Sequence, residues 1–406
     1  MPTSWRRRAK GGSFMKTKIK ISTVLIAVVM LFAVAMPLVA CDKDKPNQTP
    51  SGDREPEVVT DMIGREVTVT PGSYSRIVCI GAGALRLYCY VGDTDKLAGV
   101  EDIDNLSLSA RPKMFDGVAR PYMLANSASF IDLPSCGVGG PNAQAAEAEK
   151  ILLCNPDLVI SEYEDVDKEN ALQEQLGVPV ITVKYGNKGV FDNNVSASLA
   201  LLGKILGKEE KATTLRNYIA AEKAELSART AEVSDGPSVY LCGLGKWGTT
   251  NHLMTAQNYE PFNVAHINNA VSGLATDGIQ GIEAEKLIDM GEDIDIMIID
   301  AAAIKNILPL YREDSTMFDT IKAWREGEVY LEMAYNAYYT NLEIALVNTW
   351  YCAKVVYPDL FADVDIDAKM SEATLAFLGQ DLADEIKACT MSYGGYQKID
   401  VATFFE

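Results

Sequence analysis

Residues 208–230 read KEEKATTLRNYIAAEKAELSART, with apolar side chains at three- and four-residue steps. This spacing puts the apolar side chains along one stripe of a helix, which at about 1.5 Å per residue is roughly 35 Å long. Gly207 ends the helical pattern before it, and Asp235, Gly236 and Pro237 close the segment after it. The stripe comprises Ala212, Leu215, Tyr218, Ile219 and Leu226.

Strands and helices alternate on both sides of this helix, and the two halves begin alike. Residues 76–83 read RIVCIGAG and residues 238–245 read SVYLCGLG, each an apolar run followed by a glycine turn. Such alternation predicts parallel, doubly wound sheets, whose ligands bind beyond the carboxyl ends of the strands. We therefore predict an α/β fold of two doubly wound lobes joined by a single long helix, with the ligand cleft between the lobes. An ordinary amphipathic helix inside one continuous domain is the alternative.

The same patterns give the domain boundaries. We expect the N-terminal lobe at residues 58–207, the inter-lobe helix at 208–234 and the C-terminal lobe at 235–406. The first lobe should contain an exposed tip at residues 120–122 and a helix over 143–153. Three closing helices are expected at residues 341–356, 367–378 and 381–389.

Residues 1–41 have the layout of an export signal. Three lysines between residues 16 and 20 precede an apolar run over residues 21–36, and Leu-Val-Ala-Cys follows at residues 38–41. These four residues resemble the lipobox of bacterial lipoproteins, which implies cleavage before Cys41 and lipidation of that cysteine. A single transmembrane anchor is the alternative, although the apolar run is short for one. Residues 42–57, rich in proline and charge, then read as a flexible tether.

The net charge of the chain is strongly negative. Its 406 residues carry a formal charge of −19. Seven basic and no acidic residues lie among the first forty, so removing that segment leaves 30 basic against 56 acidic residues, a charge of −26. Such a surface stays soluble and repels nucleic acid, so DNA or RNA binding is not expected.

Two glycine turns are similar to nucleotide-binding fingerprints but differ in detail. Gly81-x-Gly83 follows a predicted strand, yet Arg86 stands where the third glycine belongs and is too large for close helix packing. Residues 243–248 (GLGKWG) match the spacing, but a poor helix start follows them. Nucleotide binding is therefore disfavoured, whereas backbone amides near Ala82 and Gly83 can still bind an anion at a helix N-terminus.

Histidine and cysteine give little support for a metal centre or a catalytic pair. His252 and His266, fourteen positions apart, are the two histidines, and neither lies in a recognisable catalytic motif. Seven cysteines other than Cys41 lie in apolar strand or helix contexts without a CxxC spacing. We expect them to be small buried core residues, with no structural zinc and no catalytic residue. They are Cys79, Cys89, Cys136, Cys154, Cys242, Cys352 and Cys389.

Residues 335–341, YNAYYTN, place three tyrosines within five positions just after a predicted strand. Tyrosines at such a place line a pocket with rings and hydroxyls, and a tyrosine oxygen is also a ligand for ferric iron. Packing of the closing helices on the sheet is the competing interpretation. Other aromatic residues follow strands or lie in loops, where the cleft would be: Tyr122, Tyr163, Tyr185 and Trp247.

Several motifs together resemble one family, the iron-complex substrate-binding proteins of bacterial ABC importers, in lipoprotein form. The likeness covers about residues 58–390. The motifs are TDMIGREV at 60–67, GPN at 140–142, EKIL at 149–152, NPDLVI at 155–160, YTNLE at 339–343 and YPDLF at 357–361.

The resemblance implies two α/β lobes joined by one long helix, with a ligand held between them and no chemistry performed. It implies a monomeric receptor on the outer face of the cytoplasmic membrane, held by lipid on Cys41, that delivers its ligand to an ABC permease and its ATPase. The ligand would be a ferric chelate or haem, with molybdate, tungstate or cobalamin as alternatives, and no cofactor is implied. Motif position assigns permease docking to Glu149 and Glu285. An exported two-domain α/β enzyme and a scaffolding surface lipoprotein remain as alternatives.

Residue type and expected loop position give a candidate ligand-binding set. A cation should balance an anionic ligand, and Arg86 and Lys246 are the candidates. The set is Ala82, Gly83, Arg86, Tyr122, Asn142, Glu162, Tyr163, Tyr185, Lys246, Trp247, His252, Tyr335, Asn336, Tyr338 and Tyr339.

Overall fold

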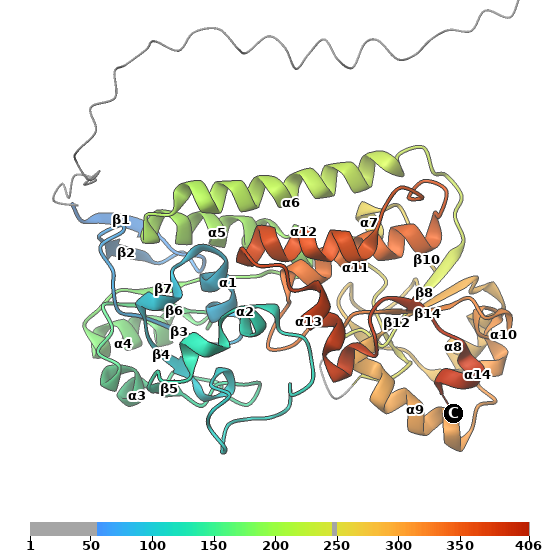
Figure 1. Cartoon of the computed structure of the whole chain (residues 1–406), viewed down its shortest axis with the longest axis horizontal. Coiled ribbons are helices and arrows are strands. Elements are labelled where there is room, and N and C mark those ends of the chain that lie inside the picture. The colour runs from blue at the N-terminus through green and yellow to red at the C-terminus, as the bar shows by residue number, and fades with distance from the viewer. Residues whose placement is uncertain (1–54, 246–249, 406) are drawn as a thin grey trace, which may run out of the picture. The chain divides into compact units, whose positions relative to one another are not determined.

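The computed structural model describes residues 55–245 and 250–405. The export signal, Cys41 and residues 42–54 of the tether lie outside this part, so what the sequence predicts for them stays a prediction. The described residues belong to one unit that holds two five-stranded sheets, with a long helix running along the top of both in Figure 1. The predicted α/β fold is confirmed.

The first lobe is built on a parallel sheet with the strand order β5-β4-β3-β6-β7. Its central strand β3 reads IVCI and is buried throughout, as expected where helices cover both faces of a parallel sheet. The strands are β3 (Ile77–Ile80), β4 (Leu97–Glu101), β5 (Ser135–Gly137), β6 (Leu158–Ser161) and β7 (Val180–Thr182), preceded by the antiparallel pair β1 (Glu57–Thr60) and β2 (Glu66–Val69). The helices are α1 (Ala84–Val91), α2 (Pro121–Phe130), α3 (Ala148–Leu153), α4 (Val166–Leu176) and α5 (Asn193–Leu206).

The second sheet has the order β10-β8-β12-β13-β14 and is parallel except for β14. Its central strands β8 and β12 are also apolar and almost wholly buried. The strands are β8 (Ser238–Cys242), β10 (Asn268–Asn269), β12 (Ile296–Asp300), β13 (Val329–Glu332) and β14 (Gln397–Lys398), with β9 (Met254–Thr255) and β11 (Gln280–Gly281) as a separate pair. The helices are α7 (Glu260–Val264), α8 (Ala284–Met290), α9 (Ile304–Glu313), α10 (Lys322–Glu326), α11 (Leu342–Val356), α12 (Ile366–Leu378), α13 (Ala383–Ala388) and α14 (Val401–Phe404).

Helix α6 (Glu209–Arg229) carries the chain from the first sheet to the second (Figure 1). It matches the helical pattern at residues 208–230 within one residue at each end, but ends five residues before the expected inter-lobe boundary at 234. The predicted stripe is buried except for Tyr218, which is half-buried. Glu222 occupies a further buried position, where its carboxylate pairs with the Lys369 ammonium of α12 at 3.2 Å. A hydrophobic pattern cannot reveal such a position, because it depends on a cation from a distant helix.

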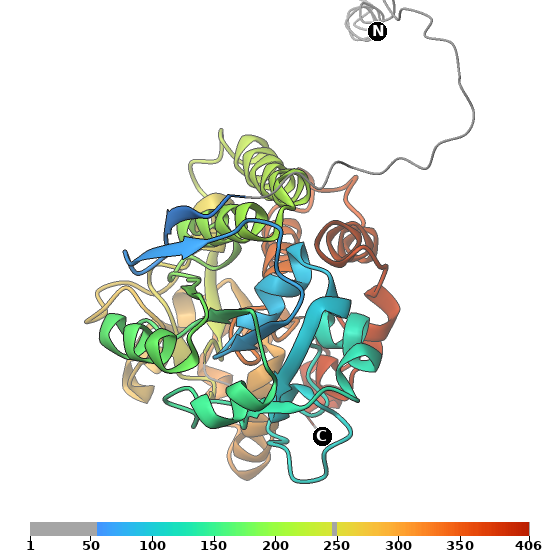
Figure 2. The same cartoon turned by 90° about the vertical axis from the view of Figure 1, so that its left-hand side faces the viewer.

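The three closing helices α11, α12 and α13 form where the sequence predicts them and pack across both lobes. Both views place α11 and α12 beneath α6 (Figures 1 and 2). One apolar cluster runs from Val59 and Val67 at the start of the first lobe to Trp350 in α11 and Phe377 in α12. The lobes therefore share a core in addition to the single connecting helix.

Two local predictions in the first lobe are wrong. Residues 120–122 do not form an exposed tip: Pro121 is the first residue of α2, a favoured place for proline, and Arg120 is buried. The Arg120 guanidinium lies 2.8 Å from the Asp104 carboxylate, a partner that local sequence does not indicate. The helix expected over 143–153 begins only at Ala148.

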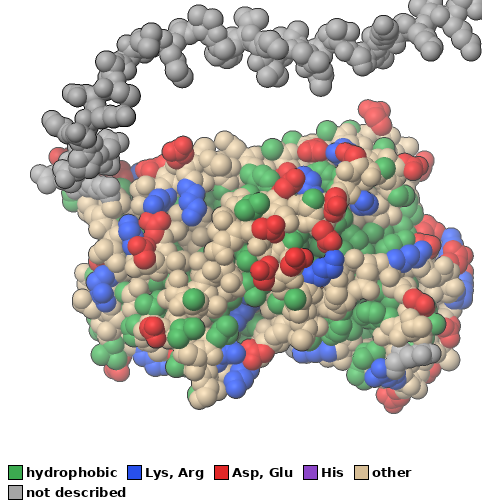
Figure 3. All heavy atoms as spheres, in the orientation of Figure 1, with side chains coloured by type: hydrophobic (Ala, Val, Ile, Leu, Met, Phe, Trp, Pro, Cys, Tyr) green, Lys and Arg blue, Asp and Glu red, His purple; other side chains and the backbone are tan. Residues whose placement is uncertain are grey.

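Surface charge and cysteine burial agree with the composition. Acidic and basic side chains are interspersed over the face shown in Figure 3, without a broad basic field on that face. The prediction of buried cysteines is confirmed for six of the seven described, and the seventh, Cys389, is half-buried. The buried six are Cys79, Cys89, Cys136, Cys154, Cys242 and Cys352.

In both lobes an aspartate carboxylate accepts backbone hydrogen bonds at the start of the first strand. The Asp157 carboxylate accepts hydrogen bonds from the backbone N–H groups of Ser75 and Arg76, at 2.8 and 2.9 Å, just before β3. The Asp295 carboxylate accepts one from the backbone N–H of Ser238, the first residue of β8, at 2.9 Å. Each aspartate directly precedes the strand that pairs with that first strand, so one carboxylate fastens two neighbouring strands.

Replacing Asp157 with Ala is expected to lower the free energy of unfolding by about 1–3 kcal/mol, because two backbone donors lose their acceptor. Asp157→Asn keeps one acceptor oxygen and should cost less. Urea denaturation of the purified variants measures both. Asp132→Ala, at an exposed position, is the control and should change stability by less than about 0.5 kcal/mol. Equal effects at residues 157 and 132 would contradict the capping role.

Candidate functional site

A cavity of about 300 Å³ lies between the lobes, beyond the carboxyl ends of β7 and β13. The first lobe contributes residues 186–190. The second lobe contributes Ala256, residues 258–261, residues 277–279, Tyr335, Asn336, Tyr339, Thr340 and Ala345. This is where a doubly wound fold binds its ligand. The chemically distinctive lining residues are Tyr259, Tyr335, Tyr339, Asn187, Asn258, Asn336, Lys188, Glu260 and Asp277. Rings beside a few polar groups suit a small amphipathic molecule.

Among the described residues that line the cavity, one cation is available to a ligand. The Glu260 carboxylate pairs with the Lys223 ammonium of α6 at 3.0 Å, and the Asp277 carboxylate accepts a hydrogen bond from the Gln257 amide at 3.2 Å. Lys188 is exposed and has no ion pair or hydrogen bond through its side chain within residues 55–245 and 250–405. Among the described residues, Lys188 is therefore the cation that an anionic group of a ligand would meet.

One wall of the cavity is a tight turn with an unusual backbone. Tyr338 and Tyr339 have φ angles of 55° and 73°, in the left-handed region that non-glycine residues seldom adopt. An isolated bridge between Asn336 and Thr340 closes the turn. Two successive tyrosines in this conformation cost free energy, so contacts elsewhere must hold them there.

Arg86 supplies those contacts from the first lobe. Its guanidinium is fully buried and donates to the carbonyl oxygens of Ala337 at 2.7 Å and Tyr338 at 3.0 Å. Its Nε donates to Asn341 Oδ1 at 3.0 Å, and the Tyr122 ring lies 4.7 Å below the guanidinium. Arg86 thus connects α1 with the turn of the other lobe, and its N–H groups donate to oxygen atoms of the protein itself.

Tyr185 supports the same turn through its ring. The Tyr185 and Tyr339 rings, from different lobes, lie 4.4 Å apart, and the Tyr185 hydroxyl donates to the Gly83 carbonyl at 3.0 Å. Gly83 has a φ of 88°, and a Cβ there would lie 2.6 Å from Tyr185 Oη. The glycine turn that is similar to a nucleotide fingerprint therefore makes room for a tyrosine.

Two carboxyl groups near the turn have shifted proton affinity. Glu101 accepts from the Tyr338 hydroxyl and from the backbone N–H of Gly81, yet burial raises its pKa to about 7. Burial and the neighbouring charge of Glu164 raise the pKa of Glu162 to about 8. At neutral pH the Glu162 carboxyl is therefore mostly protonated and neutral, so it does not repel an anion.

The sequence pattern of the family described as periplasmic binding protein matches residues 77–331 of this chain. The match begins with the first residue of β3 and reaches β13, so it includes the central strands of both sheets. The chain belongs to the periplasmic binding protein family.

Individual relatives resemble this binding protein over most of its length. The molybdate-binding protein MolA of Haemophilus influenzae is 21% identical over 360 residues, which cover 82% of this chain and 93% of MolA. A solved structure of MolA bound to molybdate aligns with a TM-score of 0.61 at 16% identity, covering 80% of this chain and 98% of that one. A periplasmic solute-binding protein of Veillonella parvula aligns with a TM-score of 0.63 at 20% identity, covering 83% and 97%. At these identities the two structures establish the shared fold.

The predicted ligand-binding residues of this binding protein fall into three groups by position. Tyr335, Asn336 and Tyr339 line the inter-lobe cavity. A second group lies behind its wall and holds the turn or its support: Ala82, Gly83, Arg86, Tyr122, Tyr185 and Tyr338, with Glu162 beside Gly81. A direct ligand contact by the second group stays a prediction.

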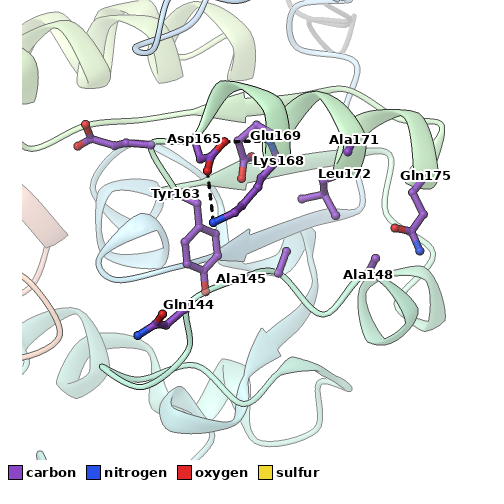
Figure 4. Close-up of a pocket in the computed structure, with 12 residues that line it drawn as sticks. Gln144, Ala145, Ala148, Tyr163, Asp165, Lys168, Glu169, Ala171, Leu172 and Gln175 are labelled. Atoms are coloured by element: carbon purple, nitrogen blue, oxygen red, sulfur yellow. Dashed lines mark hydrogen bonds and ion pairs between the residues drawn. The ribbon is translucent and has the colours of Figure 1, made fainter.

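The third group lies elsewhere. Tyr163 lines a separate cavity of about 350 Å³ in the first lobe, between α4 and residues 144–148 (Figure 4). Asn142 is exposed on the loop before α3. The His252 ring lies 5.2 Å from the Phe318 ring inside the second lobe, and burial lowers its pKa to about 4, so the ring is neutral. Lys246 and Trp247 lie outside the described residues.

Sequence reasoning missed several residues of the cavity. Lys188 follows β7 in the segment Tyr185-Gly186-Asn187-Lys188, and its place after a predicted strand was the available signal. Tyr259 and Ile279 lie in loops without a motif, and only the fold brings them to the cleft. Within the described part of the chain, no three His, Cys, Asp or Glu side chains form a group suited to a metal ion. None of the described helices has the length and apolar content needed to cross a membrane.

Proposed function

We propose that this protein is an extracytoplasmic substrate-binding lipoprotein of an ABC importer, which captures a ferric chelate or haem and delivers it to the permease. The inter-lobe cavity carries the proposal. Its three tyrosines supply flat apolar surface for an organic ligand, its asparagine amides supply hydrogen bonds, and Lys188 supplies charge for an anionic complex. Membership of the periplasmic binding protein family supports an extracytoplasmic place for this binding step.

Molybdate or tungstate is the second candidate, and the relationship to MolA favours it. A tetrahedral oxyanion would need several convergent donors, which Lys188 and the amides of Asn187 and Asn258 could supply. Cobalamin stays a third option. The lining is mostly apolar, which suits an organic complex better than a bare oxyanion, so we place the iron complex first.

The proposal includes a membrane partner and a lipid anchor. Glu149 at the start of α3 and Glu285 at the start of α8 are exposed, as docking to a permease requires. Lipid on Cys41 would hold the receptor at the outer face of the cytoplasmic membrane, with residues 42–56 as a tether, since Glu57 already belongs to β1. We further propose that it acts as a monomer without a cofactor and without catalysis.

Elemental analysis and native mass spectrometry of the protein purified from its membrane fraction test this function. We expect iron in about equimolar amount, together with an organic chelator or porphyrin. Recovery of molybdenum, tungsten or cobalt would instead favour one of the other ligands. Turnover of a small substrate by the purified protein would overturn the receptor function.

Variants of the cavity then connect the ligand to the site. Tyr339→Ala should weaken binding of the copurified ligand about tenfold, because its ring forms part of the wall. Tyr330→Ala is the matched control: this half-buried tyrosine lies on β13, outside the inter-lobe cavity, and should leave affinity unchanged. Equal affinities for both variants would place the ligand elsewhere.

A further inference from the structure

The two lobes repeat one short segment. Residues 147–152 read EAEKIL and residues 283–288 read EAEKLI, and each begins with the residue that precedes a helix, α3 or α8. The two helices are also equivalent in topology. Each leads into the strand, β6 or β12, that pairs with the first strand of its sheet, and each is followed by the capping aspartate described above.

Only one of the two neighbouring apolar residues in each copy is buried in the core. Ile151 and Leu287 are fully buried, each two residues after the helix's glutamate. The next residue is exposed in both copies: Leu152 by 45% and Ile288 by 41%. Leu153 follows Leu152 and is 82% exposed. Single exposed apolar residues are common, but core packing does not account for the same exposed position in both lobes.

The glutamate and the exposed apolar residue lie on one face of each helix, because they are three positions apart. The lysine between them is directed elsewhere. Lys150 pairs with the Glu147 carboxylate at 2.8 Å, and Lys286 donates to the Ser272 carbonyl at 2.8 Å. Within the described residues neither Glu149 nor Glu285 has an ion pair. Each lobe therefore presents an unpaired carboxylate next to a branched apolar side chain.

We propose that Leu152 and Ile288 are the apolar contacts of a two-point docking surface, and that its partner is a membrane protein with two equivalent faces. Each face of the partner would offer a cation for the glutamate and an apolar patch for the neighbouring leucine or isoleucine. This inference rests on the proposed function, because it extends the permease docking assigned to Glu149 and Glu285. A lipid surface fits less well, because anionic head groups would repel both glutamates.

The surroundings of α3 add space for such a partner. The cavity that contains Tyr163 is also lined by Ala148, the residue before Glu149, and by Leu172 of α4 (Figure 4). Small alanine side chains on both sides of this cavity provide apolar surface between its charged residues Asp165, Lys168 and Glu169. A side chain of the partner adjacent to the cation that meets Glu149 can enter there. The apolar contact of the first lobe is thus larger than that of the second.

Site-specific photo-crosslinking in the native host tests the proposal. The full chain carries a photoreactive phenylalanine at position 152, 288 or 375, and adducts are identified by mass spectrometry. Leu375 of α12 is the control, since it is 51% exposed and outside both repeats. Positions 152 and 288 should both crosslink to the same membrane-spanning subunit of one ABC transporter, and position 375 should not. Adducts with lipid alone or with a second copy of this chain would overturn the proposal.

A binding measurement separates this inference from the function on which it rests. The double variant Leu152→Ser and Ile288→Ser should bind the identified permease in nanodiscs about tenfold or more weakly than wild type. The matched double variant Leu360→Ser and Leu375→Ser should bind within about twofold of wild type, because both leucines are exposed outside the repeats. If the first double variant binds as wild type while Glu149→Arg weakens binding, the apolar contacts are wrong and docking stands. If no ABC subunit crosslinks to or binds the wild-type chain, the proposed function fails as well.

Discussion

Replacing Arg86 with Met is expected to lower the free energy of unfolding by about 3–5 kcal/mol. The substitution keeps an unbranched apolar stem but leaves the carbonyls of Ala337 and Tyr338 and the Asn341 amide oxygen without a buried donor. The strained turn at residues 336–340 then loses its support from the other lobe. Denaturant titration gives the stability change, and hydrogen exchange should speed up at the Ala337 and Asn341 amides, which bond to Tyr339 and Tyr335 within this turn.

Two further variants separate the bridging role from charge and from surface effects. Arg86→Lys keeps the positive charge, but one ammonium cannot reach three acceptors in a fixed fork, so an intermediate loss is expected. Arg76→Met removes an exposed arginine that donates to the carbonyls of Asn155 and Cys154 within the first lobe, and should cost about 1 kcal/mol or less. If Arg86→Met were as mild as Arg76→Met, Arg86 would not hold the lobes together.

Between pH 4 and pH 8, the free energy of unfolding of Asp300→Asn relative to wild type is expected to change by about 3–4 kcal/mol. Asp300 and Glu332 are opposed on β12 and β13 and are both buried. Burial raises the pKa of Asp300 from 3.8 to about 7, and burial with the charge of Asp300 raises the pKa of Glu332. A raised pKa means that the folded state binds the proton more tightly than the unfolded chain does. The stability that this tighter proton binding by Asp300 contributes is complete below pH 4 and is lost as the pH rises through 7.

Asn cannot ionise, so relative to wild type Asp300→Asn should gain stability as the pH rises from 4 to 8. Several other groups surround the pair: the Cys352 thiol lies 3.3 Å from Glu332 Oε2, and Tyr259, Tyr335 and Tyr396 are close enough to interact electrostatically. Glu332→Gln should give a change of the same sign. Asp295→Asn is the contrasting control. A hydrogen bond from Lys322 lowers the pKa of Asp295, so the stability that the Asp295 carboxylate contributes is lost as the pH falls. If the difference in unfolding free energy between Asp300→Asn and wild type did not change with pH, the raised pKa of Asp300 would be contradicted.

The parts of the fold that local periodicity specifies could be predicted from the sequence. Helix α6 and helices α11 to α13 have apolar residues at helical spacing and clear ends, so their bounds follow from the sequence to within a few residues. The prediction of an exposed tip at residues 120–122 failed because the burial of Arg120 depends on a residue distant from this segment. A local reading of Arg-Pro-Tyr indicates an exposed turn, and only the buried Asp104 carboxylate makes the burial of Arg120 favourable.

The candidate site depended more strongly on distant partners. The tyrosine-rich run at residues 335–341 could be recognised as unusual, and four of its residues do line the inter-lobe cavity. That Tyr338 and Tyr339 adopt left-handed backbone conformations could not be predicted, because no glycine or asparagine marks either position. Loops such as residues 256–261 and 277–279 reach the cavity only through the packing of the second lobe.

The sequence by itself determined the α/β class, the long connecting helix, the repeated segments of the two lobes and the buried cysteines. Each of these depends on the order of apolar and polar residues over a few turns or strands. Only the tertiary structure decided the role of Arg86, whose sequence position suggests a cation for the ligand. Three of its hydrogen-bond acceptors lie about 250 residues further along the chain, in the other lobe. A guanidinium will bind any suitable oxygen that folding brings within reach, and here folding brought the oxygens of the turn.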